Sequence, residues 1–282
     1  MKAWILFIIW AAIFYPIYPS LIQTWIQDSN NSHGILVPFI SAFFAWQQRD
    51  QLGDCKVEPQ SMGGILLVLS LFIYVVSYAG AVTVAIRISM VSSLICLILY
   101  NFGKDVFMSL MFPLLFLFFM IPVPVSITSL ISLPLQTLAT NISTVIIRLA
   151  SIPVYQEGHM LYFVETQLEV AEACSGIHSI VALLMLSTVL VHYFPMTLKY
   201  KIIIIFSAIP IALFANIVRV SGTGILAHFY GASVARGFLH QFSGMAVFVF
   251  GLFLLGMEYR IIRKIEKIKR TFLKGNYNGG FI

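Results

Sequence analysis

Long runs of hydrophobic residues, separated by short polar segments, follow one another along most of the chain. A helix needs about 20 consecutive apolar residues to cross a bilayer. By this criterion the sequence predicts eight membrane spans, the second of them short and either little tilted or re-entrant. They cover about residues 3–22, 34–48, 63–82, 86–103, 106–124, 171–195, 201–226 and 239–258. The first has no small-residue cleavage site after it, so we expect an uncleaved anchor.

A different pattern fills the stretch from about 125 to 170, between the fifth and sixth spans. Leu and Ile recur at helical spacing from Ser126 to Ala150, with Ser, Thr, Gln and Asn between them, which predicts an amphipathic helix lying at the membrane interface. Short apolar runs on either side of Glu157-Gly158-His159 then predict a small hairpin. Three prolines are expected to break the path into this region: Pro122, Pro124 and Pro134. The predicted fold is an all-α polytopic membrane protein with this amphipathic helix and hairpin ahead of the sixth span.

Composition supports a chain that lies mostly in lipid. Hydrophobic residues make up 60% of the sequence and charged residues 10%, against roughly 45–50% and about 25% in soluble domains. No soluble domain or repeat is visible, so we expect one transmembrane domain over residues 1–282 with a basic tail from 260 to 282. Seven of the 17 Lys and Arg residues lie between Arg260 and Lys274. Beside a span, such a cluster favours contact with anionic lipid headgroups over nucleic acid.

The distribution of positive charge also predicts the orientation. With the N-terminus inside and eight spans, 13 of the 17 Lys and Arg residues face the cytoplasm, as the positive-inside rule requires. The other four face outside: Arg87, Arg148, Arg219 and Arg236. Both termini are then cytoplasmic in the inner membrane, and the amphipathic helix and hairpin are periplasmic.

This topology brings three chemically active residues to one depth. Cys174 lies near the start of the sixth span, Arg219 near the end of the seventh and His240 at the start of the eighth, so all three are expected near the outer surface. A thiolate is a nucleophile whose formation a neighbouring cation favours, His can pass protons, and Arg can donate to a developing oxyanion. The sequence therefore predicts an active site at this edge of the membrane.

Each of these residues also has a structural alternative. A lone Cys in a membrane helix is usually a small packing residue, an Arg near a helix end often snorkels, and His240 alone would fit an interfacial histidine. Arg219, however, shares a helix face with Asn216 and Thr223, so a polar stripe accompanies it. The scattered set of three cysteines, Cys55, Cys96 and Cys174, is no disulfide framework.

Glu172 and His178 flank the candidate nucleophile. Cys174 and His178 are four residues apart and would share a helix face, which raises the alternative of a zinc site completed by His240. No second spaced pair of ligands supports that alternative, so we expect neither a metal nor another cofactor. Glu172, His178 and Asn216 are instead expected to contact the substrate or to support the reacting residues.

The stretch Val170-Ala-Glu-Ala-Cys-Ser-Gly-Ile-His-Ser179 resembles the nucleophile motif of the exosortase/archaeosortase family. Further resemblances follow the family's order over about residues 30–258. They include Ser32–Ser41, Phe112–Pro124, Pro134-Leu-Gln136, Pro153–Gly158, Asn216-Ile-Val-Arg-Val220 and the His240 region before Ser243-Gly244.

This resemblance implies a membrane-embedded cysteine protease or transpeptidase. Its substrates would be secreted proteins with a C-terminal sorting tag of the PEP-CTERM type: a short motif, a transmembrane helix and a basic cluster. The family's Cys, Arg and His correspond to Cys174, Arg219 and His240. His178 stands where family members often carry Arg or another polar residue, which leaves the tag motif open. The acceptor of the cleaved substrate, a polysaccharide, a lipid or water, is also left open.

Two other classes of function compete with this interpretation. A transporter or flippase would place polar sites or broken helices near the membrane midplane, whereas most polar residues here are expected at the outer edge. A non-catalytic membrane scaffold for exopolysaccharide export is the third class. A thioester trapped between Cys174 and a tagged substrate would separate the three.

Overall fold

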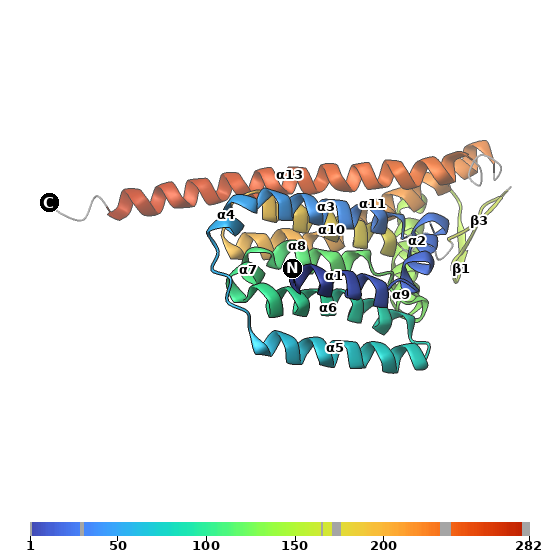
Figure 1. Ribbon diagram of the computed structural model, residues 1–282. Helices are drawn as coiled ribbons and strands as arrows, with labels where there is room; N and C mark the ends of the chain where they lie inside the picture. The colour runs from blue at the N-terminus through green and yellow to red at the C-terminus, as the bar shows by residue number, and fades with distance from the viewer. Residues whose placement is uncertain (1, 29–30, 165, 171–175, 232–237, 278–282) are drawn as a thin grey trace. The chain divides into compact units, whose positions relative to one another are not determined.

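The computed structural model describes residues 2–28, 31–164, 166–170, 176–231 and 238–277, without the side chains of Lys2, His178, 238–243 and 270–277. The chain divides into two compact units, Met1–Pro124 and Val125–Ile282 (Figure 1). The first unit has a hydrophobic cluster built around Ile98, Val106 and Leu114, and the second has three clusters of its own. The expectation of a single domain over the whole chain stays a prediction.

The first unit consists of helices in its described residues. They are α1 (Lys2–Ile13), α2 (Ile17–Gln27), η1 (Ser32–Ile35), α3 (Leu36–Gln47), α4 (Arg49–Asp54), α5 (Ser61–Ala79), α6 (Thr83–Phe102), α7 (Lys104–Ser109), α8 (Met111–Phe116) and η2 (Leu117–Met120). Helices α5 and α6 pack closely, because the backbone at Gly63 lies so near that of Tyr100 that an added Cβ would be 2.5 Å from the Tyr100 nitrogen. Small residues allow this kind of approach between membrane helices.

The first predicted span is wrong as a single helix. Helices α1 and α2 meet at a bend of 63°. Pro16 caps α2 at its N-terminus, and a proline there cannot donate the backbone hydrogen bond that would continue α1. The two halves are anchored separately, since Trp10 Nε1 donates to Ser93 Oγ at 2.8 Å and Trp25 Nε1 donates to the Met120 carbonyl at 2.9 Å.

The second unit combines four long helices with one small sheet in its described residues. The elements are α9 (Val125–Leu149), β1 (Tyr155–Glu157), β2 (Met160–Tyr162), β3 (Gln167–Glu169), α10 (Ile177–Tyr193), α11 (Leu198–Tyr230) and α13 (Phe238–Tyr277). Helix α11 packs against α9, α10 and α13. Helix α13 extends well past the beginning of α11 in Figure 1.

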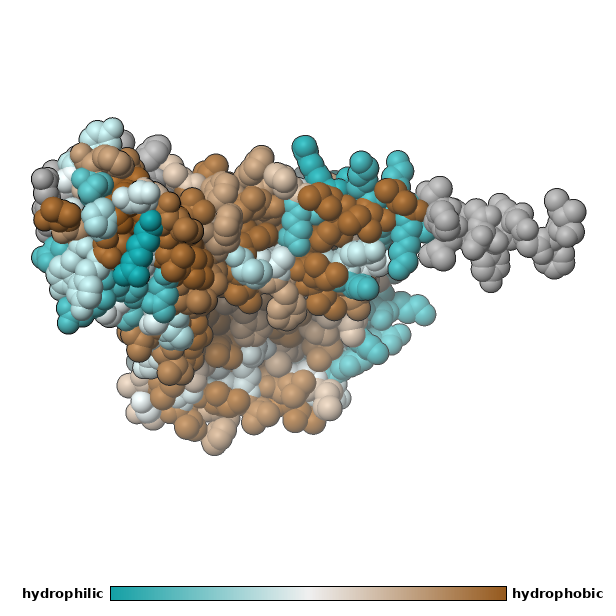
Figure 2. Space-filling view, turned by 180° about the vertical axis from the view of Figure 1, so that it is seen from behind, coloured by the Kyte–Doolittle hydropathy of each residue, from teal (hydrophilic) through white to brown (hydrophobic). Residues whose placement is uncertain are grey.

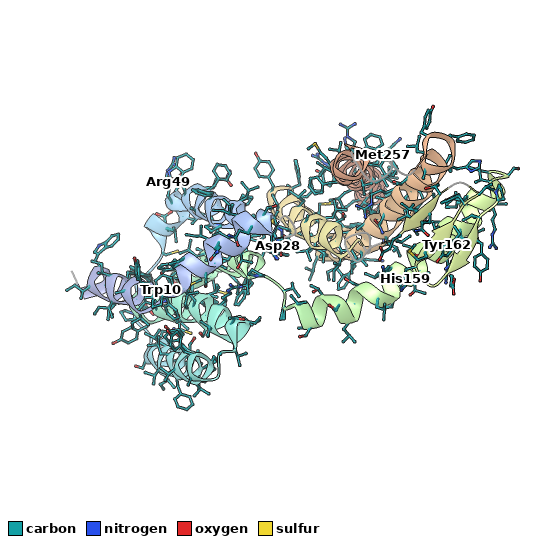
Figure 3. All side chains as sticks on the ribbon, turned by 90° about the vertical axis from the view of Figure 1, so that its right-hand side faces the viewer. Trp10, Asp28, Arg49, His159, Tyr162 and Met257 are labelled. Carbon is teal, nitrogen blue, oxygen red and sulfur yellow. The ribbon has the colours of Figure 1, made fainter. Side chains whose placement is uncertain are left out.

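The amphipathic helix predicted for 126–150 is confirmed as α9. Pro122 and Pro124 precede it, as predicted, but Pro134 lies inside the helix without ending it, which corrects that part of the prediction. In Figure 1 and Figure 3, α9 runs across the direction of α13 rather than along it. An interfacial helix has this orientation, although α9 is also long and apolar enough to cross a membrane. Its place at the interface stays a prediction.

The predicted hairpin is confirmed and carries a third strand. Glu157 pairs with Met160 across a loop of Gly158 and His159, and Gly158 has a φ of +58°. A glycine with positive φ at the first position of a two-residue loop is typical of tight hairpins. Strand β3 then adds to β2, which gives the order β1-β2-β3.

The described residues contain five helices long and apolar enough to cross a membrane, or six if α1 and α2 form one broken span. They are α5, α6, α9, α11 and residues 244–269 of α13. The all-helical polytopic fold is confirmed, whereas the number of eight spans is not. The segments 34–48 and 106–124 form shorter helices, the latter in three pieces, and the helix of 171–195 begins at Ile177.

The surface fits a protein that lies in lipid. On the face shown in Figure 2, hydrophobic side chains cover the middle of the long helices, and hydrophilic side chains gather toward their ends. Exposed hydrophobic residues such as Phe72, Phe206 and Phe253 are at least 60% accessible. Such side chains would be unfavourable in water and are expected on a lipid-facing helix.

Candidate functional site

Helix α11 carries two of the predicted site residues on one face. Asn216 is 1% exposed and Arg219, three residues later, is partly buried with its Nε atom shielded from solvent. Residues three apart are neighbours on a helix surface. The expected polar stripe on this helix is therefore directed largely into the protein, where a polar group is costly unless it is bonded.

Helix α10 begins later than the sequence suggested. Its first residue is Ile177, and Gly176 before it is left-handed, with φ +82° and ψ 0°. A left-handed residue does not continue a right-handed α-helix. Helix α10 therefore begins after Gly176, and because Cys174 lies outside the described residues, the shared face of Cys174 and His178 stays a prediction.

Gly176 packs directly on Asn216. A Cβ atom added to Gly176 would lie 3.2 Å from both Cβ and Cγ of Asn216. Two features favour glycine at this position. Its φ is positive, and a larger side chain would clash with the Asn216 carboxamide. The contact places Gly176, two residues after Cys174 in the sequence, beside α11 and one helical turn from Arg219.

The other end of that segment is fixed at Val170. This residue is 1% exposed, and its N–H donates to the His159 carbonyl at 2.9 Å. Its own carbonyl accepts a hydrogen bond from Nε2 of Gln136, on α9. Both backbone polar groups of Val170, the last described residue before Cys174, are thus bonded.

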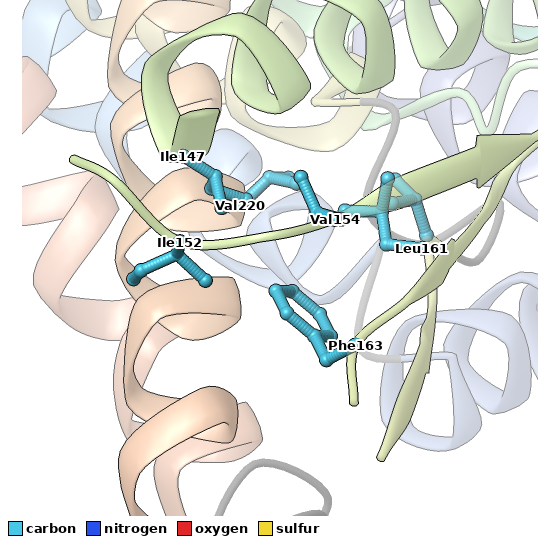
Figure 4. Packing of buried hydrophobic residues seen from close by; sticks show 7 residues of the cluster. Ile147, Ile152, Val154, Leu161, Phe163 and Val220 are labelled. Carbon is cyan, nitrogen blue, oxygen red and sulfur yellow. The ribbon is translucent and has the colours of Figure 1, made fainter. Parts of the chain in front are cut away.

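A hydrophobic cluster holds the hairpin against the helices. Figure 4 shows its residues, which come from α9, the hairpin region and α11: Ile147, Ile152, Val154, Leu161, Phe163, Val170 and Val220. Val220 is the neighbour of Arg219 in sequence. Arg148 adds two polar contacts, because its Nε and Nη2 atoms donate to the Val154 carbonyl at 3.3 and 3.2 Å. In Figure 3 the hairpin, with His159 and Tyr162 labelled, lies near one end of α9.

Several predicted site residues fall where the structure gives no side chain. Glu172 and Cys174 lie outside the described residues. His178 is the second residue of α10 and His240 the third of α13, but their side chains are not described. The convergence of Cys174, Arg219 and His240 therefore stays a prediction, as does the zinc alternative. What the structure brings together is Asn216 with Gly176, two residues after Cys174.

Gln136 is a buried polar residue that the sequence alone did not identify as part of the site. It is 8% exposed and lies on the same face of α9 as Thr140 and Ser143, both fully buried. A Gln on the buried face of an amphipathic helix was a visible signal, but its partner 34 residues away was not. The Gln136 carboxamide thus contacts Val170, the last described residue before Cys174, and the Asn216 carboxamide contacts Gly176, the first described residue after it.

Comparison with protein families places most of the chain in one family. The family described as Transmembrane exosortase (Exosortase_EpsH) matches residues 25–257. The match includes the hairpin, the segment 171–175 and the beginning of α13. No curated protein and no solved structure matches the chain.

Proposed function

This chain belongs to the exosortase EpsH family, and on that premise we propose that it is a cysteine protease or transpeptidase embedded in the inner membrane. It removes C-terminal sorting tags from secreted proteins at the outer face. The observation that carries the proposal is the packing of Gly176 on Asn216, because it puts the residue two positions after Cys174 against α11, one helical turn from Arg219. The family alone supports a sorting enzyme, and this geometry supports the choice of nucleophile.

In the proposed site, Cys174 reacts as its thiolate. Cys174 stands three residues before Ile177, the first residue of α10. The N-terminus of a helix carries about half a positive charge and stabilises a nearby anion. Arg219, always protonated, adds a full charge on the adjacent helix. Both effects lower the free energy of the thiolate relative to the thiol, and the thiolate is the attacking species.

The reaction follows from these roles. The tag's transmembrane helix docks laterally, with its basic end in the cytoplasm and its recognition motif at the outer surface. The Cys174 thiolate attacks the scissile carbonyl carbon, the C–N bond breaks, and a thioester forms. One of His240 and Arg219 gives a proton to the leaving amine, and the other stabilises the charge that develops on the oxyanion. Water or an outer nucleophile, such as a polysaccharide or lipid, then cleaves the thioester and regenerates the thiolate.

The proposed orientation places both termini in the cytoplasm. Helix α13 has 40 residues, which is about 60 Å, twice the roughly 30 Å of the hydrocarbon core. The half that projects from the membrane carries the basic cluster between Arg260 and Lys274. Positive charge of this kind is retained on the cytoplasmic side, where it meets anionic headgroups.

Co-expression with a tagged secreted protein tests the function. A reporter with a C-terminal motif, a transmembrane helix and a basic cluster should lose its tag only when this protein is present. The shortened product should be digested by protease added to spheroplasts, because cleavage occurs outside. An uncut reporter for every tag motif tried, with the enzyme present in the membrane, would favour the transporter or scaffold classes. A product protected from protease would contradict the orientation.

A further inference from the structure

The contact between Gln136 and Val170 joins the α9 helix to the start of the Cys174 segment. The Gln136 side chain is 8% exposed, and its Nε2 donates to the Val170 carbonyl. A buried carboxamide is costly unless it is bonded, and a carbonyl that loses its donor in the interior bears the same cost. The hydrogen bond between the Gln136 carboxamide and the Val170 carbonyl therefore offsets the cost of burying both groups.

Val170 is the last described residue before Cys174. Its side chain is buried in the hydrophobic cluster shown in Figure 4, and its N–H is held by the His159 carbonyl. These two contacts fix where Val170 lies. The direction in which the chain leaves depends on the peptide plane after Val170, because the carbonyl oxygen lies in the plane that leads to the next residue. The Gln136 hydrogen bond sets that plane.

We propose that Gln136 is a positioning residue for the nucleophile of the proposed reaction. Gln136 holds Val170, the last described residue before Cys174, through its carbonyl, and Asn216 contacts Gly176, the first described residue after Cys174. Gln136 acts on Cys174 only through the backbone. Its loss changes how often the thiolate is in the attacking geometry rather than how tightly the tag is bound.

Two substitutions separate the hydrogen bond from the packing. Gln136→Leu keeps a side chain of similar size but removes the donor. Gln136→Glu keeps the shape and donates only while the carboxyl group is protonated. Thr144→Val is the matched control, because Thr144 is also buried on α9 and its hydroxyl bonds only within the helix, to the Thr140 carbonyl. All variants are made in the full-length chain with Cys55→Ala and Cys96→Ala, so that Cys174 is the only thiol.

The experiment measures two quantities in membranes with equal protein levels. The first is the rate of reporter cleavage, resolved into kcat and KM. The second is the rate at which a thiol reagent alkylates Cys174, which does not depend on cleavage. For Gln136→Leu we expect kcat to fall about 10-fold or more, as for a buried carbonyl left without its donor. KM should stay within about twofold of the KM of the unmutated background. The rate of Cys174 alkylation should change together with the fall in kcat.

The pH dependence of Gln136→Glu distinguishes donation from a general structural role. Its cleavage rate relative to the unmutated background should fall as pH rises, because ionisation turns the carboxyl group into an acceptor that repels the Val170 carbonyl. Thr144→Val should match that background throughout. Wild-type kcat and alkylation in Gln136→Leu would overturn the proposal. So would equal losses in both Gln136 variants at every pH with an unchanged alkylation rate. Cleavage by a Cys174→Ala variant would instead overturn the proposed function itself.

Discussion

Replacing Cys174 by alanine or serine should leave the protein in the membrane and abolish tag removal. Alanine has no nucleophile, and the serine hydroxyl lacks the accessible anionic form of a thiol. Removal of a catalytic nucleophile in a known hydrolase costs about 10⁶-fold in rate. We expect a loss of roughly 10³-fold or more here, measured as the shortening of a co-expressed tagged reporter.

The other two cysteines provide the control for this result. Cys55 contacts Ser109 Oγ at 3.4 Å, and Cys96 is partly buried in α6, both in the first unit. Cys55→Ala and Cys96→Ala should process the reporter at the wild-type rate. If a Cys174 variant still shortens the reporter, the assignment of the nucleophile is wrong.

Arg219→Lys should lose most of the activity even though it keeps the positive charge. Lysine replaces the planar group of five donors by a point charge on a flexible stem. Removal of one oxyanion donor in a known hydrolase costs about 10²–10³-fold in rate, and we expect a loss of this size for Lys and at least as large a loss for Ala. His240→Ala should be impaired comparably, because residues that act in one transition state give non-additive losses.

The level of protein in the membrane is compared first, since Arg219 is partly buried and its loss can disturb packing. Arg87→Lys is the matched control. Arg87 is another arginine assigned to the outer side, and its Nη2 atom donates to Thr24 Oγ1 at 3.3 Å in the first unit. The Arg87→Lys variant should cleave the reporter at the wild-type rate. Wild-type cleavage by Arg219→Lys at equal protein level would remove Arg219 from the site and leave a Cys–His pair.

Local sequence signals predicted the parts of the fold that local chemistry determines. Glu157-Gly158-His159 predicted the turn correctly because a glycine that tolerates positive φ is visible in the sequence. The spacing of Leu and Ile predicted α9 correctly because an apolar helix face repeats at helical period in the sequence itself. Pro134 was misjudged because a proline can be accommodated within a helix when its surroundings support the remaining turns.

Contacts between distant segments limited the prediction of the site. The stretch before Ile177 mixes small residues with Glu172 and Ser175, so hydrophobicity did not mark where α10 begins; the left-handed conformation of Gly176 is visible only in the structure. Val170, the partner of Gln136, is 34 residues away in the sequence, and no local sequence pattern indicates that the two residues are in contact. The count of eight spans is not confirmed for a related reason, because helices of 12 to 17 residues are too short to meet the length criterion alone and fit beside longer ones in a folded protein.

Trapping of the thioester tests the central claim most directly. A tagged reporter is incubated with the enzyme in membranes, quenched in acid and separated under non-reducing conditions. We predict a covalent complex whose mass is that of the enzyme plus the reporter without its tag. It should be released by hydroxylamine, which cleaves thioesters, and should be linked to a peptide that contains Cys174. Tag removal that proceeds without such a complex, or a complex linked through another residue, would contradict the account.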